Sequence, residues 1–240
     1  MIMENLNQQV MQVFLANVKE NKVILDEVKW FFALPEDMIK DTLQQVAQSK
    51  IVGLRGFSED FEEDIFALYE TDVPKAFEMY VKYYLNGFNK ERTPYSIPQL
   101  SEKTQVKMLN LPNAKDLLMM YREYHELCGE AQEILLSKPE LFREYVRVRK
   151  IASSILLKMF QSEKKEELTA IYIKIYRLDD DEEMNMLKYI PIDSKTILYY
   201  ISHYGFREKT RDLLMVYCLQ SLIAQGKSVS WLQSMHIPLK

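Results

Sequence analysis

A tyrosine recurs at nearly regular intervals along the second half of this chain. Tyr121, Tyr145, Tyr172 and Tyr200 are separated by 24, 27 and 28 residues, and Tyr80 fits the same frame 41 residues before Tyr121. Each follows apolar residues spaced three and four apart, the spacing that puts side chains on one face of an α-helix. Self-similarity at a fixed period is typical of proteins built from stacked units. The interval therefore predicts a series of short helical repeats.

Prolines mark where the tyrosine-bearing helices are predicted to begin. Pro112 and Pro139 each stand ahead of one such helix, with Asn110 and Ser137 two residues earlier as candidate helix caps. Proline is tolerated in a first helical turn, where its missing N–H would have had no partner. A shorter helix precedes each start, so the predicted unit is a helical hairpin. Because two short helices bury only one side against each other, each hairpin needs a neighbouring hairpin.

The chain is therefore predicted to be all-α, with a right-handed α-solenoid of hairpins of about 24–28 residues each. The alternative is a compact bundle, because apolar spacing alone makes amphipathic helices resemble one another. We expect a single all-helical domain over residues 1–240. Within it, residues 1–104 form a less regular helical part with loops near 51–58 and 86–98. Residues 105–225 form the repeats, and residues 226–240 form a C-terminal cap.

The recurring aromatic side chains are predicted to fill the core between the repeats. Val148 and Ile175 complete apolar stripes that also contain Tyr145 and Tyr172. A second aromatic residue follows four of the five recurring tyrosines, four positions later at Tyr84, Tyr176 and Tyr204 and three positions later at Tyr124. These aromatics are interpreted as core residues rather than as a ligand cage.

The segment from Leu109 to Ala131 resembles a known repeat family. It contains a Leu-Pro-Asn-Ala turn at 111–114 and the sequence Leu-Cys-Gly-Glu-Ala at 127–131. It is similar to the short, HEAT-like helical hairpins of uncharacterised bacterial proteins, in which such turns open the longer and the shorter helix. The similarity is close over about 25 residues and loose over the rest of residues 105–225. It implies a helical-hairpin fold and no particular activity.

Composition and charge exclude several classes of protein. The chain is 48% hydrophobic with a formal net charge of −4, so it has a core to bury and no global attraction for nucleic acid. Two cysteines are too few for a disulfide scaffold. The N-terminal sequence lacks the features of a signal peptide, and no stretch of about 18 apolar residues is present. We expect a cytoplasmic protein without a membrane partner.

Candidate chemistry is sparse, and no catalytic residue, metal site or cofactor is assigned. His125 and Cys128 lie three residues apart, as two zinc ligands can, but a tetrahedral site needs further ligands and none is close in sequence. We interpret the pair as structural. The acidic run from Asp179 to Glu183 is interpreted as a helix N-terminus with an aspartate cap. Glycine-rich phosphate loops and a Gly-x-Ser-x-Gly elbow are absent from the sequence.

One cluster of cations is a candidate binding surface. Its members are predicted to lie on the longer helices of two successive repeats: Arg143, Arg147, Lys150, Lys174 and Arg177. Stacked repeats would bring them together as a basic patch able to receive an acidic peptide or a nucleic-acid backbone. The alternative is a solvated face whose charge is neutralised by nearby glutamates such as Glu144.

Three functions compete at this point. The leading one is a non-enzymatic scaffold that binds a protein or peptide, including acidic peptides, on a helical-repeat surface; its oligomeric state is left open. The second is a helical-repeat nucleic-acid-binding protein or a DNA-repair enzyme of the kind in which HEAT-like repeats form a glycosylase. The negative net charge argues against it. A helix-turn-helix regulator is a third, for which residues 20–50 offer no basic recognition helix.

Overall fold

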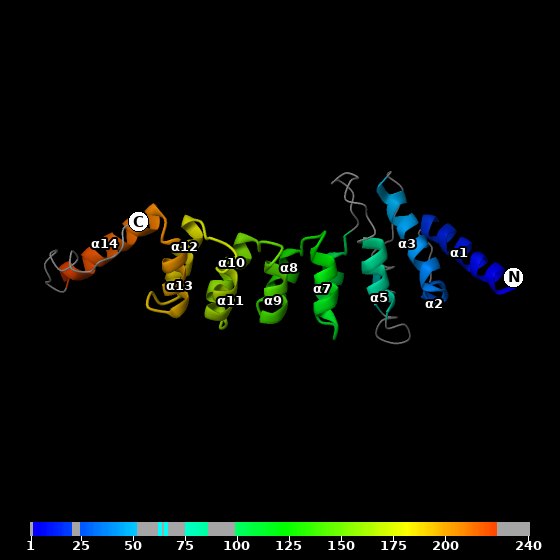
Figure 1. The fold of residues 1–240 in the computed structure, drawn as a ribbon, viewed down its shortest axis with the longest axis horizontal. Helices are drawn as coiled ribbons and strands as arrows, with labels where there is room; N and C mark the ends of the chain where they lie inside the picture. The colour runs from blue at the N-terminus through cyan, green and yellow to red at the C-terminus, as the bar shows by residue number, and fades with distance from the viewer. Residues whose placement is uncertain are drawn as a thin grey trace. The chain divides into compact units, whose positions relative to one another are not determined.

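The protein is helical throughout the part of the chain that the computed structural model describes, which comprises residues 2–20, 25–51, 62–63, 65–66, 75–85 and 99–224. Within these ranges no strand occurs, which confirms the predicted all-α class (Figure 1). The elements are α1 (Ile2–Glu20), α2 (Leu25–Phe32), α3 (Glu36–Ile51), α5 (Ala76–Met79), the π-helix η1 (Tyr80–Leu85), α6 (Glu102–Met108), α7 (Ala114–Arg122), α8 (Gly129–Leu135), α9 (Pro139–Val146), α10 (Ser153–Gln161), α11 (Lys165–Tyr172), α12 (Asp180–Tyr189), α13 (Lys195–Tyr204) and α14 (Glu208–Ala224).

The chain folds into two compact units, Met1–Ile134 and Leu135–Lys240. The boundary between them falls within α8, whereas the sequence pattern changes character near residue 105. Three predicted segments lie outside the described residues: the loop near 51–58 apart from its first residue, the loop near 86–98, and the C-terminal cap at 226–240.

The first unit has a hydrophobic core built by its N-terminal helices. The ring of Phe14 in α1 stacks on that of Phe31 in α2, with centroids 4.0 Å apart. Beside this pair, the amide of Asn17 donates a hydrogen bond of 2.6 Å to the carboxylate of Glu27. Further along, α3 packs against η1. The N-terminal helices therefore pack on one another and on η1, which contains Tyr80.

All five recurring tyrosines are buried, with at most 1% of their surface exposed. In four places the residue four positions later stacks or tilts against the tyrosine ring, with centroids 4.7–5.2 Å apart. Tyr124 follows Tyr121 by three residues, whereas the ring stacked on Tyr121 is that of His125, four residues later and 4.7 Å away between centroids. Positions i and i+4 lie above one another on a helix, so the four-residue spacing brings the two rings together.

Buried amide side chains fix the starts of two shorter helices in the first unit. Gln105 donates from Nε2 to the carbonyl of Leu100 at 2.9 Å, and Gln132 donates in the same way to Leu127 at 2.7 Å. Each bond reaches back five residues, and the two glutamines are 27 residues apart. The Oε1 atom of Gln105 also accepts the backbone N–H of Cys128 at 2.7 Å. Equivalent side chains therefore satisfy equivalent backbone groups in the shorter helices that precede α7 and α9.

In the second unit, helices two elements apart along the chain pack together. The shorter helix α10 packs against α12, and α12 against α14, while α9 packs against α11 and α11 against α13 (Figure 1). Hydrogen bonds cross between these neighbours. The Nζ of Lys164 donates to the carbonyl of Ser137 at 2.8 Å, and Thr196 Oγ1 donates to the carbonyl of Glu166 at 3.4 Å. Helices of successive hairpins in this unit are therefore in contact.

Some of the predicted helix starts and caps agree with the structure, and others do not. Pro139 is the first residue of α9, as predicted, so the cap position falls on Lys138 and not on Ser137. A turn in which Ala114 N bonds to Leu111 O precedes α7, and the N-cap position of α7 is Asn113. Asn110 is therefore not the cap, and its side chain donates to the carbonyl of Val106. The predicted aspartate cap of α12 is confirmed: Asp179 and Glu182 form a reciprocal capping box.

Candidate functional site

The five candidate basic residues lie at the C-terminal ends of α9 and α11 and in the turns that follow. Arg143 belongs to α9, Arg147 caps its C-terminus, and Lys150 follows in the turn. Lys174 and Arg177 lie between α11 and α12. All five are exposed, and α9 and α11 pack together.

Two of these five cations are engaged by buried carboxylates. Arg147 Nη1 binds both oxygens of Glu144, at 3.0 and 2.9 Å, and Lys150 Nζ lies 3.3 Å from Glu182 Oε1. Glu144 and Glu182 are only 7% and 6% exposed. A buried carboxylate needs a charged or hydrogen-bonding partner, because water no longer solvates it. Arg147 and Lys150 are therefore part of the packing of α9 and α12, and the predicted patch is smaller than five.

The remaining three cations have no carboxylate partner of this kind. Within the part of the chain that the structure describes, Arg143, Lys174 and Arg177 form no ion pair. Cations near a helix C-terminus interact favourably with the helix dipole, by about 0.3–1 kcal/mol. That interaction explains why cations are tolerated there, and it leaves their charged groups available to a ligand.

Two aliphatic side chains accompany these cations. Val148 and Ile175 are each 42% exposed, and each follows its buried tyrosine, Tyr145 or Tyr172, by three residues. Both continue the apolar spacing of the sequence, yet neither is buried in the core. Because α9 ends at Val146 and α11 at Tyr172, both residues lie in turns where the helical phase no longer sets the direction of the side chain. The turns after α9 and α11 thus expose an aliphatic side chain beside cations.

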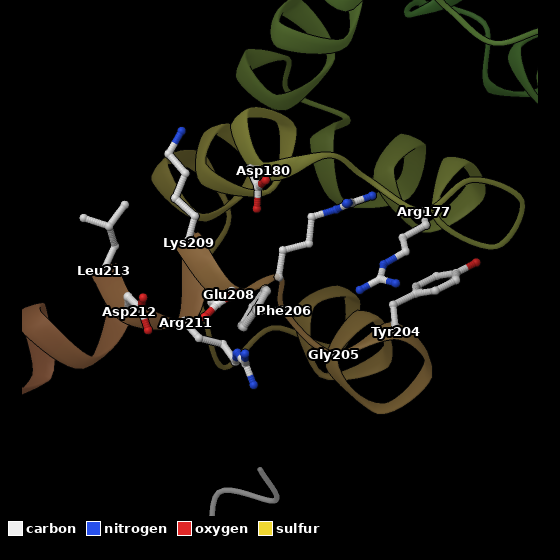
Figure 2. Close-up of a pocket in the computed structure, with 11 residues that line it drawn as sticks. Arg177, Asp180, Tyr204, Gly205, Phe206, Glu208, Lys209, Arg211, Asp212 and Leu213 are labelled. Atoms are coloured by element: carbon white, nitrogen blue, oxygen red, sulfur yellow. The ribbon is translucent and has the colours of Figure 1, made fainter. Parts of the chain in front are cut away.

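Arg177 also lines an open pocket of about 910 Å³ between the turn before α12, the end of α13 and the start of α14 (Figure 2). In this view the side chains of Arg177 and Tyr204 lie at one end of the pocket, while Lys209 and Leu213 point away from it. The charged residues of the lining are Arg177, Asp180, Arg207, Glu208, Lys209, Arg211 and Asp212.

A buried hydrogen-bond network positions the wall of this pocket. Glu183, 0% exposed, accepts the hydroxyl of Tyr200 at 2.8 Å on Oε1 and the backbone N–H of Arg207 at 3.0 Å on Oε2. The Nε of Arg207 donates to the carbonyl of Leu178 at 2.9 Å, and the N–H of Leu178 donates to the Tyr200 hydroxyl at 3.2 Å. Burial and the bond to Glu183 raise the pKa of Tyr200 above its usual range, so the hydroxyl stays protonated.

Gly205 allows the chain to turn into the pocket after α13. Its φ of 63° lies in the left-handed region, which is unfavourable for residues with a Cβ atom. Its N–H donates to the carbonyl of Ile201 at 3.0 Å, which closes the last turn of α13. The glycine therefore brings the chain directly from Tyr204 to Arg207.

The arginines of the pocket lack a carboxylate partner in the described part of the chain. Among the described residues, Arg177, Arg207 and Arg211 form no ion pair with a carboxylate. Arg211 Nε and Asp180 Oδ1 are buried atoms that have no hydrogen-bond partner in this part of the chain. Sequence reasoning identified Arg177 but missed Arg207 and Arg211; their spacing of four residues after a glycine was the signal available. The arrangement suits a ligand that carries a negative group next to a hydrogen-bond donor.

The His125–Cys128 pair has a structural environment. His125 is 1% exposed, and its Nε2 lies 3.3 Å from the carbonyl oxygen of Leu85. Cys128 Sγ accepts the backbone N–H of Ala131 at 3.5 Å, at the start of α8. No group of three His, Cys, Asp or Glu side chains able to hold a metal occurs within the described ranges.

Comparison with known proteins gives no relative: no family model, no curated protein and no solved structure matches the chain. A search for membrane spans finds no helix among the described residues with both the length and the apolarity to cross a bilayer.

Proposed function

We propose that the protein is a helical-repeat module that binds an acidic peptide segment of a partner protein and performs no catalysis. The observation that carries the proposal is the set of exposed cations without an internal carboxylate, Lys174 and Arg177, flanking the exposed side chain of Ile175. An acidic peptide with an apolar residue offers the complementary groups.

The repeat character of the proposal is supported by bonds that recur at the tyrosine interval. Lys164 reaches back 27 residues to Ser137, and Lys209 reaches back 28 residues to Asp181. In an α-solenoid each hairpin packs on the next, and the packing of α9 on α11 and of α10 on α12 is of this kind. We therefore retain the right-handed α-solenoid as part of this proposal.

The charge balance favours a peptide over nucleic acid. Of the five cations first considered, Arg147 and Lys150 are already bound to buried glutamates. A protein that binds the phosphate backbone engages many phosphates at once and has a dense basic surface. Three separated cations and a net charge of −4 suit a short segment with few carboxylates better.

The test is a selection of random peptides displayed at the free C-terminus of a carrier protein, with the full-length chain as the immobilised target. We expect enrichment of peptides that combine acidic and apolar residues. The same selection on Lys174→Glu/Arg177→Glu should lose them, because the cations that attract the peptide are reversed in sign.

The matched control is Lys188→Glu/Lys195→Glu, which changes the net charge equally at the opposite end of the α12–α13 hairpin. It should enrich the same peptides as the natural chain. Failure to enrich any acidic peptide, or equal enrichment on the Lys174→Glu/Arg177→Glu variant, contradicts the proposal. Salt-dependent binding of duplex DNA in place of peptide would favour the nucleic-acid alternative.

A further inference from the structure

Three guanidinium groups around one pocket have no carboxylate of the described chain to neutralise them. Arg177 comes from the turn before α12, Arg207 from the turn before α14, and Arg211 from α14 itself. Lys209, the fourth cation of the lining, is already paired with the exposed Asp181 at 3.1 Å. Guanidinium groups bind carboxylates in a planar, two-point geometry, which makes an arginine-lined pocket a specific site for that group.

The pocket also contains carboxylates, which accept hydrogen bonds and disfavour a ligand with several negative charges. Asp180, Glu208 and Asp212 line it together with the arginines, so its charge is mixed (Figure 2). A polyanion would be repelled by these carboxylates. The Oδ1 of Asp180 lacks a donor among the described residues, as the Nε of Arg211 lacks an acceptor. A small shift of either side chain on binding would give each a partner from a ligand that has both kinds of group.

The last residue of a peptide has both a negative group and a hydrogen-bond donor. Its terminal carboxylate and its backbone amide N–H are attached to the same Cα atom. We infer that the pocket binds the free C-terminal carboxylate of the partner peptide, with Arg177 and Arg211 as donors to the carboxylate and Asp180 as acceptor of the last amide. The inference rests on the proposed function and specifies which part of the peptide is recognised.

Arg207 contributes a positive charge that is held in a fixed position at the wall of the pocket. Its backbone N–H is bound to Glu183 and its Nε to Leu178, at 3.0 and 2.9 Å, so its guanidinium is fixed at the pocket wall before any ligand arrives. A preorganised cation costs little side-chain entropy on binding. Arg177, by contrast, is exposed and unpaired within the described chain, and connects the pocket to the turn that contains Lys174 and Ile175.

The experiment measures the affinity of one selected peptide in three forms by fluorescence polarisation: the free acid, the C-terminal amide, and the free acid with its nearest acidic side chain replaced by the corresponding amide. With the full-length natural chain, we expect amidation of the C-terminus to weaken binding by at least about tenfold, the cost of losing a charge-assisted pair of hydrogen bonds. Neutralising the side chain should have a smaller effect.

Two variants locate the effect. Arg177→Gln and Arg211→Gln should each weaken binding of the free acid and shrink the difference between acid and amide. Arg143→Gln removes an exposed cation outside the pocket and should leave that difference unchanged. Because Arg211 is partly buried, the thermal unfolding of its variant is compared with that of the natural chain, and Arg177→Gln, at an exposed site, gives the reading independent of folding.

The outcomes separate this inference from the proposed function. Equal affinity for the acid and the amide, with binding still sensitive to Lys174→Glu/Arg177→Glu, overturns the C-terminal pocket and leaves peptide binding standing. If neutralising the acidic side chain weakens binding more than amidation of the C-terminus does, the C-terminal pocket is likewise overturned and peptide binding stands. Absence of any selected acidic peptide overturns both.

Discussion

The hydroxyl of Tyr200 donates a 2.8 Å hydrogen bond to the carboxylate of Glu183, and both residues are completely buried. The same carboxylate holds the backbone of Arg207 at the pocket wall. A residue of the regular tyrosine series thus connects the core of the second unit to the candidate binding site. Tyr172, one interval earlier, has no such acceptor, since its hydroxyl is buried without a partner in the described chain.

This difference gives the first test. Tyr200→Phe leaves the Glu183 oxygen and the Leu178 N–H without a partner, so we expect the free energy of unfolding to fall by about 1–3 kcal/mol. Tyr172→Phe removes only an unsatisfied hydroxyl and should cost nothing or stabilise the protein. Urea unfolding followed by circular dichroism measures both. A loss of the same size in the two variants would show that the network does not carry the energy assigned to it.

Glu62 and Glu63 are neighbours with opposite dependences on pH. Burial is the main cause that raises the pKa of Glu62, so its protonated form is favoured in the folded state. Stability from this group is present below the ordinary glutamate pKa and is lost as the pH rises through the raised pKa. The hydrogen bond from Lys103 lowers the pKa of the exposed Glu63, which therefore contributes stability that is lost as the pH falls.

We expect Glu62→Gln to gain stability relative to the natural chain as the pH rises from about 4 to 7, because the variant has no buried charge to form. Glu63→Gln should show the opposite and smaller trend, since an exposed pair is screened by solvent. Urea titrations at several pH values provide the comparison. Parallel curves for the natural chain and Glu62→Gln would mean that Glu62 ionises as freely in the folded as in the unfolded state.

His125 should act as an aromatic core residue. Replacing it with alanine removes the ring that stacks on Tyr121 and opens a cavity, at a cost of about 2–4 kcal/mol. His125→Tyr restores the aromatic found at Tyr84, Tyr176 and Tyr204, so it should recover a large part of that loss. Thermal melts in zinc and in chelator complete the test: a metal-dependent shift that disappears in His125→Tyr would contradict the structural role.

The cations of the original patch should separate into structural and binding residues. Arg147→Glu places a negative charge beside the buried Glu144 and should lower the free energy of unfolding by about 1–3 kcal/mol, because Arg147 itself is exposed to solvent. Lys174→Glu alters an exposed residue without an ion pair in the described chain, so stability should change by less than about 0.5 kcal/mol while peptide binding is lost. If Arg147→Glu were as stable as the natural chain, its ion pair would be incidental.

The sequence reveals the helical fold class because the apolar period is visible in it. The recurring tyrosines, the start of α9 at Pro139 and the cap at Asp179 all follow from local rules that involve neighbouring residues. The stacking of His125 on Tyr121 is not visible in a pattern of recurring tyrosines, because the residue four positions after Tyr121 is a histidine and the nearest following tyrosine, Tyr124, is only three positions away.

The candidate site was less accessible to sequence reasoning. Charge alone does not distinguish Arg147, bound to a buried glutamate, from Lys174, because that difference depends on which carboxylate the packing buries. The exposure of Val148 depends on where α9 ends. Arg207 and Arg211 join Arg177 only through the packing of α12 on α14, which no local pattern specifies.

The most direct measurement for the central claim is a ¹⁵N-NMR titration of the full-length chain with one selected acidic peptide. We expect shift changes to concentrate at the backbone amides of Lys174, Ile175 and Arg177, and at the side chain of Arg211, with amides of α1–α3 unaffected. Changes confined to α1–α3, or spread evenly over the chain, would contradict peptide binding at the exposed cations of the second unit.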